Sequence, residues 1–134
     1  HQRCRTSLLF AGRVARAEQR LKRLLSAFRA QDWQACFELV WAEFWDMHAL
    51  FETSEPSFGY LRPQTLTVLA AVKEFWRDHH DGPLATLDAG PNVHLLWRAD
   101  QEKLKVLFTD QTKELNMSCL HIRGDEQGRN EKKI

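Results

Sequence analysis

Residues 84–98 read LATLDAGPNVHLLWR, a pattern of two short apolar runs with a turn between them. The turn, residues 89–92, is Ala-Gly-Pro-Asn, and such small or turn-forming residues commonly connect strands. In the second run apolar residues alternate with a mixed set, as in a strand that has one face covered. The apolar set is Val93, Leu95 and Trp97, and the mixed set is His94, Leu96 and Arg98. The segment therefore predicts an antiparallel strand pair over residues 84–88 and 93–98.

Three helices are expected before this strand pair. Residues 13–30 repeat apolar side chains at helical spacing, and we expect this stripe to pack inward. The stripe consists of Leu21, Leu24, Leu25 and Phe28. Asp32 is a natural N-cap for a long, buried helix over residues 33–51. Pro63 suits the first position of a third helix, which Gly82 and Pro83 should end.

The remaining segment predicts a further helix and strand. Asp100 is expected to cap a short helix that carries Leu104, Leu107 and Phe108, and residues 117–122 resemble a strand. Residues 123–133 contain no large apolar side chain, so the tail at 123–134 is predicted to be disordered. The expected fold class is α+β, with three helices followed by a small antiparallel sheet and a packed helix. These elements should form a single domain over residues 1–122.

The composition excludes several classes of protein. With 134 residues, of which 43% are hydrophobic, the chain can bury one core. The 19 basic and 18 acidic side chains nearly cancel, which argues against nucleic acid or a membrane surface as partner. No apolar run approaches the roughly 20 residues of a membrane span. Cys4, Cys36 and Cys119 are odd in number and widely spaced, so they predict no disulfide framework or closed zinc site and fit a reducing cytoplasm.

Charged residues on the first two helices have several interpretations. A basic run on the first helix could contact phosphate or RNA, but it lacks aromatic stacking partners, which favours a solvated face. This run consists of Arg13, Arg16, Arg20, Lys22 and Arg23. Glu43 and Asp46 lie three residues apart on the second helix and could pair as acid and base. A solvated helix face is the expectation for them as well.

The histidines are expected to be structural. His48 follows Phe44 by four residues on an apolar helix face, where a histidine is usually a hydrogen-bonded core residue. Adjacent histidines at a helix end usually point apart, so His79, His80 and Asp81 predict no metal site.

Asp88 is the candidate catalytic residue. It stands at the end of the first predicted strand, and the small residues after it would let a ligand approach the backbone closely. An aspartate in this position can act on a substrate, or it can simply cap the turn. The local pattern leaves both interpretations open.

Several segments resemble a known enzyme family. The string TLDAGPNVHLL, residues 86–96, resembles the signature of the diphosphomevalonate decarboxylases, members of the GHMP kinase superfamily. Residues 47–49, Met-His-Ala, and residues 57–61, Ser-Phe-Gly-Tyr-Leu, are similar to the family's segments upstream of this signature. The pair Thr6 and Ser7 stands at about the family's distance before the first helix. The chain therefore resembles the C-terminal part of such an enzyme. This resemblance implies a GHMP kinase C-terminal-like fold.

The resemblance implies an activity and its site. The implied reaction is phosphorylation of the tertiary hydroxyl of diphosphomevalonate by ATP with Mg²⁺, followed by loss of phosphate and decarboxylation to isopentenyl diphosphate. Asp88 matches the family's catalytic aspartate, and the backbone at Ala89 and Gly90 would line the substrate pocket. The superfamily's phosphate loop has no counterpart among the scattered glycines. ATP and Mg²⁺ are therefore expected to bind mainly to an N-terminal lobe, and this fragment alone should be inactive.

Other functions and partners remain open in the sequence. A phosphomevalonate decarboxylase or a mevalonate 3-kinase would use the same scaffold. A non-catalytic α+β module that binds a protein is the alternative from another class. The resemblance implies the N-terminal lobe of the same enzyme as one partner and, because the family is commonly dimeric, a second copy as another.

Overall fold

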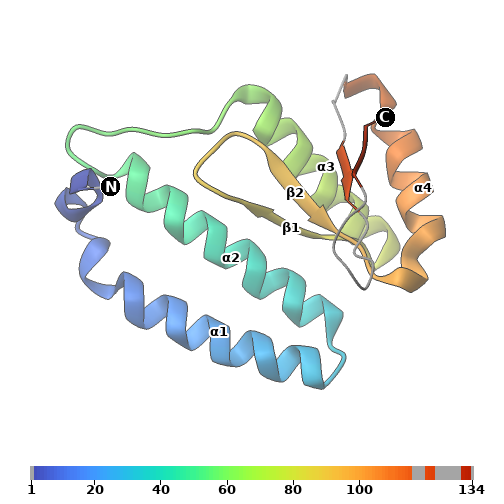
Figure 1. The fold of residues 1–134 in the computed structure, drawn as a ribbon, viewed down its shortest axis with the longest axis horizontal. Coiled ribbons are helices and arrows are strands. Elements are labelled where there is room, and N and C mark those ends of the chain that lie inside the picture. The colour runs from blue at the N-terminus through green and yellow to red at the C-terminus, as the bar shows by residue number, and fades with distance from the viewer. Residues whose placement is uncertain (1, 116–119, 123–130, 134) are drawn as a thin grey trace.

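The computed structural model describes residues 2–115, 120–122 and 131–133. Its helices are α1 (Arg13–Arg29), α2 (Trp33–Glu52), α3 (Pro63–His79) and α4 (Glu102–Gln111), with 3₁₀ turns at Gln2–Thr6, Phe10–Gly12, Ala99–Gln101 and Lys113–Leu115. The strands are β1 (Leu84–Leu87), β2 (Val93–Leu96), β3 (Leu120–Ile122) and β4 (Glu131–Lys133). Helices α1 and α2 run side by side, and the β1–β2 hairpin lies between α2 and α3 (Figure 1). The expected α+β class is confirmed.

The core lies where α2, α3 and β1 meet. Phe44, Val72 and Phe75 from the helices and Leu84 and Leu87 from the strand are at most 3% exposed. Each such side chain stabilises the fold by about 1.5–3 kcal/mol relative to an exposed position.

Aromatic rings extend this core in both directions. The rings of Phe37 and Trp76 stack with centroids 4.5 Å apart and link α2 to α3. At the other side, Phe75 meets Phe108 edge to face at 5.3 Å, which attaches α4 to α3. Geometries of this kind are favourable beyond the area that they bury. The hairpin therefore rests on a rigid support of packed rings.

The predicted starts of α2 and α3 are confirmed. The side chain of Asp32 accepts a hydrogen bond from the backbone N–H of Ala35 at 3.1 Å, which satisfies a donor that the first turn leaves free. Pro63 is the first residue of α3. This helix ends at His79, and its C-cap residue His80 adopts a left-handed conformation with φ 54° two residues before the expected Gly82.

The strand pair also agrees with the prediction. β1 and β2 are antiparallel, with Leu87 opposite Val93 and Thr86 opposite His94. Val93, Leu95 and Trp97 pack against the core, whereas His94 and Leu96 are exposed. The alternation along residues 93–98 thus marks the covered face of the hairpin correctly.

The expected inward face of α1 is wrong in part. Leu24 packs against the core, but Leu21, Leu25 and Phe28 are 56%, 46% and 45% exposed. Lys22 and Arg23 are exposed as expected, but the rest of the basic run and the acidic pair do not form solvated faces. Instead Arg13, Arg16 and Arg20 form ion pairs with Glu43 and Asp46 on α2. Because these five charges meet between the helices, α1 turns its arginines inward and much of its apolar stripe outward.

Near the C-terminus one expectation is wrong, and another is confirmed over the residues that the structure describes. Asp100 makes no capping bond; it pairs with Arg98, and the side chain of Gln101 instead accepts from the Arg98 backbone N–H at 2.7 Å. In the predicted strand at 117–122, residues 120–122 form β3, which pairs with β4, while 117–119 lie outside the described residues. Apart from β4, the tail predicted to be disordered also lies outside the described residues.

No helix within the described segments is both long and apolar enough to cross a membrane.

Candidate functional site

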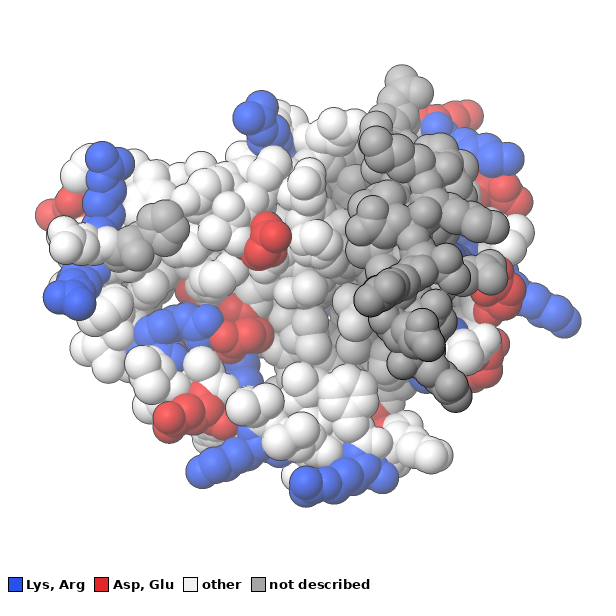
Figure 2. Space-filling model, viewed as in Figure 1, with Lys and Arg blue, Asp and Glu red and all other residues white. Residues whose placement is uncertain are grey.

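The turn between β1 and β2, residues 88–92, carries the candidate site. Asp88 follows the last residue of β1, and its side chain is 72% exposed. Figure 2 shows that the surface around the hairpin carries few charged side chains on this face. A carboxylate that is open to solvent in weakly charged surroundings can meet a bound ligand directly.

Helix α2 holds the start of the turn through His48. Its Nε2 lies 3.0 Å from the backbone carbonyl oxygen of Asp88, and the ring is 1% exposed. A carbonyl oxygen can only accept, so Nε2 must carry the proton and donate. Burial lowers the pKa of His48, because the charged imidazolium is disfavoured away from water. The predicted structural role of His48 is confirmed, and its partner is the candidate catalytic residue itself.

Helix α3 holds the other end of the turn through Thr65. The Thr65 hydroxyl donates to the carbonyl oxygen of Pro91 at 2.8 Å and accepts from the backbone N–H of Arg62 at 3.2 Å. This second bond also caps the start of α3. Two helices therefore fix the backbone on which Asp88 stands, as a catalytic group requires.

The small residues after Asp88 leave its carboxylate close to the backbone. A methyl group added at Gly90 would lie 3.1 Å from Oδ1 of Asp88, which is tighter than an ordinary contact, so the carboxylate would have to shift. Ala89 is exposed and Gly90 is partly exposed. Both residues are thus accessible to solvent, and their contact with substrate stays a prediction.

His94 also lies at this site, although it was not among the predicted site residues. Its Nε2 is 3.4 Å from Oδ2 of Asp88, and its side chain is 52% exposed. The sequence contained a usable signal, because alternation places His94 on the open face of the second strand. Pairing with Thr86, two residues before Asp88, brings the two side chains together.

The other polar groups that were considered lie apart from the turn. Asp81 pairs with Arg98, with Oδ2 and the guanidinium nitrogen Nη2 2.9 Å apart, while the ring of His79 packs against Phe75 at 4.3 Å. Within the described part of the chain, no group of three His, Cys, Asp or Glu side chains is placed to hold a metal ion. Cys4 and Cys36 are both buried and free.

Two of the hollows on the described surface are lined by residues outside the turn. One, of about 490 Å³, lies between α2 and α3 and includes Phe37, Lys73 and Trp76. The other, of about 580 Å³, includes Arg3 and Tyr60. The Asp88 side chain itself is 72% exposed.

Comparison with known families identifies the domain. Residues 1–129 match the family described as the mevalonate 5-diphosphate decarboxylase C-terminal domain. The chain belongs to this family. No curated protein sequence matches it.

Solved structures of mevalonate diphosphate decarboxylases share this fold. One from Legionella pneumophila is 45% identical with a TM-score of 0.81, and the match covers 83% of this chain and 35% of that one. One from Enterococcus faecalis, described in terms of mevalonate diphosphate mediated ATP binding, is 26% identical with a TM-score of 0.74 and coverages of 82% and 34%. A third, described as "MDDEF in complex with MVAPP, AMPPCP and Magnesium", is 26% identical with a TM-score of 0.73 and coverages of 81% and 33%.

The chain thus spans about a third of the length of these relatives, 35% of the Legionella chain. The predicted relationship to the C-terminal part of a diphosphomevalonate decarboxylase is confirmed.

Proposed function

We propose that this chain is the C-terminal lobe of an ATP-dependent decarboxylase that converts diphosphomevalonate to isopentenyl diphosphate. The observation that carries the proposal is the exposed Asp88 carboxylate on a turn that α2 and α3 hold by hydrogen bonds, in a chain of this family. The enzyme would act in the cytoplasm on a small-molecule substrate. Its N-terminal lobe would complete the site, and a second copy would complete a homodimer.

Asp88 can serve both steps of the reaction. Its carboxylate can orient the tertiary hydroxyl and accept the proton as the phosphoryl group transfers. When phosphate then leaves, positive charge develops at the same carbon, and a fixed negative charge beside it lowers the barrier. Because His48 and Thr65 hold the turn, little reorganisation of its backbone would be needed at the moment of reaction. The exposed backbone at Ala89 and Gly90 would lie against the substrate.

ATP and Mg²⁺ would be held mainly by the N-terminal lobe. A relative has been solved with MVAPP, AMPPCP and magnesium, which supports a nucleotide and a metal for the whole enzyme. Mg²⁺ prefers carboxylates together with phosphate oxygens and water. Among the described residues no group of three His, Cys, Asp or Glu side chains is placed to hold such an ion. When bound, the metal would neutralise charge on the transferring phosphoryl group.

The test uses the full-length protein that contains this chain, with diphosphomevalonate, ATP and Mg²⁺. Carbon dioxide and ADP are both measured for the native protein, for Asp88→Asn and for the control Asp78→Asn. Asp78 lies on α3 with its side chain 60% exposed. We expect Asp88→Asn to lower turnover about 10²-fold or more, as removal of a catalytic base does, and Asp78→Asn to leave it unchanged.

Each other outcome identifies a different function. ADP without carbon dioxide would indicate a kinase, and turnover of the monophosphate alone would indicate a phosphomevalonate decarboxylase. If neither product forms with either substrate, the chain is a non-catalytic module and the proposal is wrong. Full activity of Asp88→Asn would remove Asp88 from the mechanism.

A further inference from the structure

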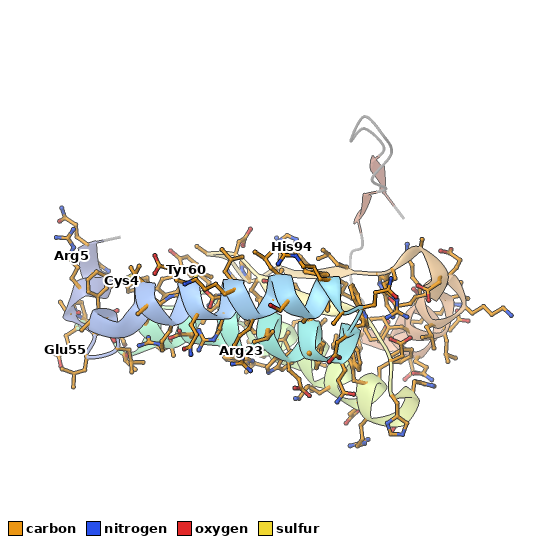
Figure 3. The ribbon with its side chains drawn as sticks, turned by 90° about the horizontal axis from the view of Figure 1, so that it is seen from below. Cys4, Arg5, Arg23, Glu55, Tyr60 and His94 are labelled. Atoms are coloured by element: carbon orange, nitrogen blue, oxygen red, sulfur yellow. The ribbon has the colours of Figure 1, made fainter. Side chains whose placement is uncertain are left out.

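His94 and Asp88 meet on one face of the hairpin. His94 lies opposite Thr86 in the antiparallel register, and opposed residues point to the same face. Asp88 is two residues after Thr86 and shares this face by the alternation of strand side chains. The result is a distance of 3.4 Å between Nε2 of His94 and Oδ2 of Asp88. Figure 3 shows His94 on the same side of the molecule as Tyr60, which lies in the loop before α3.

The Asp88 side chain has few other constraints. His48 and Thr65 hold the backbone of the turn, not the carboxylate, which is 72% exposed. Of the side chains that the structure describes, only His94 brings a basic nitrogen within ion-pair distance of that carboxylate. Without this neighbour the carboxylate could rotate freely about its side-chain bonds. A catalytic base has to be held in one orientation, because small displacements of the reacting atoms are costly in rate.

We propose that His94 is a positioning residue, which holds Oδ2 of Asp88 through its Nε2–H and leaves Oδ1 for the substrate hydroxyl. This inference rests on the proposed function and assigns a second side chain to the same site. The 3.4 Å separation between Nε2 of His94 and Oδ2 of Asp88 is longer than an ideal hydrogen bond. Bonds of this kind commonly tighten when the substrate binds.

The test replaces His94 in the full-length enzyme and separates kcat from KM. His94→Leu keeps the bulk but removes the donor, so kcat should fall about tenfold while KM for both substrates stays unchanged. His94→Gln carries an amide donor at the position of Nε2 and should restore most of the activity. His94→Asn ends one carbon earlier and should not. Thermal unfolding of the three variants should match the native protein, because the side chain is half exposed.

A double variant shows whether His94 acts through Asp88. If it does, His94→Leu should add no further loss to Asp88→Asn, whereas two independent groups would give additive losses. Additive losses, full activity of His94→Leu, or a raised KM for ATP with unchanged kcat would each overturn the proposal. The last result would instead make His94 a nucleotide-binding residue.

A measurement without turnover keeps this inference distinct from the proposed function. The ring ¹⁵N signals of His94 should shift in Asp88→Asn, and those of His79, which packs against Phe75, should not. Unshifted His94 signals would overturn the contact even in an active enzyme. An inactive native protein with shifted signals would reject the decarboxylase function and still support the contact.

Discussion

Helix α2 makes two buried polar contacts on opposite sides, and they work in opposite ways. Asp46 faces α1, where its carboxylate accepts from Arg16 at 2.7 and 2.9 Å and from Arg20 at 2.6 Å. His48, two residues on, faces the β1–β2 turn and donates to the carbonyl of Asp88. The first contact favours the ionised form of Asp46, whereas burial favours the neutral form of His48. One face of α2 thus carries the ion pairs with α1, and the opposite face packs against the hairpin.

The pKa values of Asp46 and His48 are both lowered, but for opposite reasons. Hydrogen bonds from Arg16, and then from Arg20, lower the pKa of Asp46 to about 2, because they favour its charged form. Burial lowers the pKa of His48, because it disfavours the charged form. Both groups bind protons more readily in the unfolded chain, so both contributions to stability are lost on acidification. The contribution of His48 to stability is lost as the pH falls below 6.5, the ordinary pKa of histidine. That of Asp46 is lost as the pH falls below 3.8, the ordinary pKa of aspartate.

The charged contact should give the largest effect on stability. A shift of the Asp46 pKa from 3.8 to about 2 corresponds to about 2 kcal/mol, so Asp46→Asn should lower the free energy of unfolding by about that amount. The difference between native protein and variant should shrink as the pH falls from about 4 towards 2. Denaturant unfolding at several pH values measures it, with Asp78→Asn as an exposed control that changes little. A pH-independent difference would mean that the arginines do not stabilise the charge.

The neutral contact should give a smaller effect. His48→Leu leaves the carbonyl of Asp88 without its donor, and because Asp88 is exposed, water can replace part of the bond. We expect a loss of about 1 kcal/mol at pH 8. The variant should also lose the decline in stability that the native protein shows as the pH falls below 6.5. Urea titrations between pH 5 and 8 test this, and identical pH profiles would show that His48 is not buried in its neutral form.

The outward face of α1 should give the smallest effect. Leu25 is 46% exposed, so Leu25→Gln should change the free energy of unfolding by no more than about 0.5 kcal/mol. The matched control is Leu69→Gln on α3, where the side chain is 2% exposed and the same change should cost several times more. Equal losses for the two variants would mean that α1 packs through its leucines and that the charged interface is secondary.

Much of the fold could be predicted from local patterns. Asp32 begins α2, Pro63 begins α3, and the alternation along residues 93–98 gives the covered face of the hairpin. Each of these signals depends on bonds or steric limits within a few residues, so it survives without knowledge of the neighbours. The position of Asp88 directly after the first strand could be predicted from local sequence in the same way.

Which faces of these helices and strands pack together depended on residues far apart in the sequence. Helical periodicity showed that α1 has an apolar and a basic stripe, but not which of them meets α2. That choice came from Asp46, which lies 30 residues from Arg16 and attracts the arginines inward. Likewise, the contacts of Asp88 with His48 and His94 follow from packing of α2 and from strand register. Local sequence specified the elements because backbone bonding is local, whereas the assembled site arose only when long-range charge pairing and strand pairing set the elements against one another.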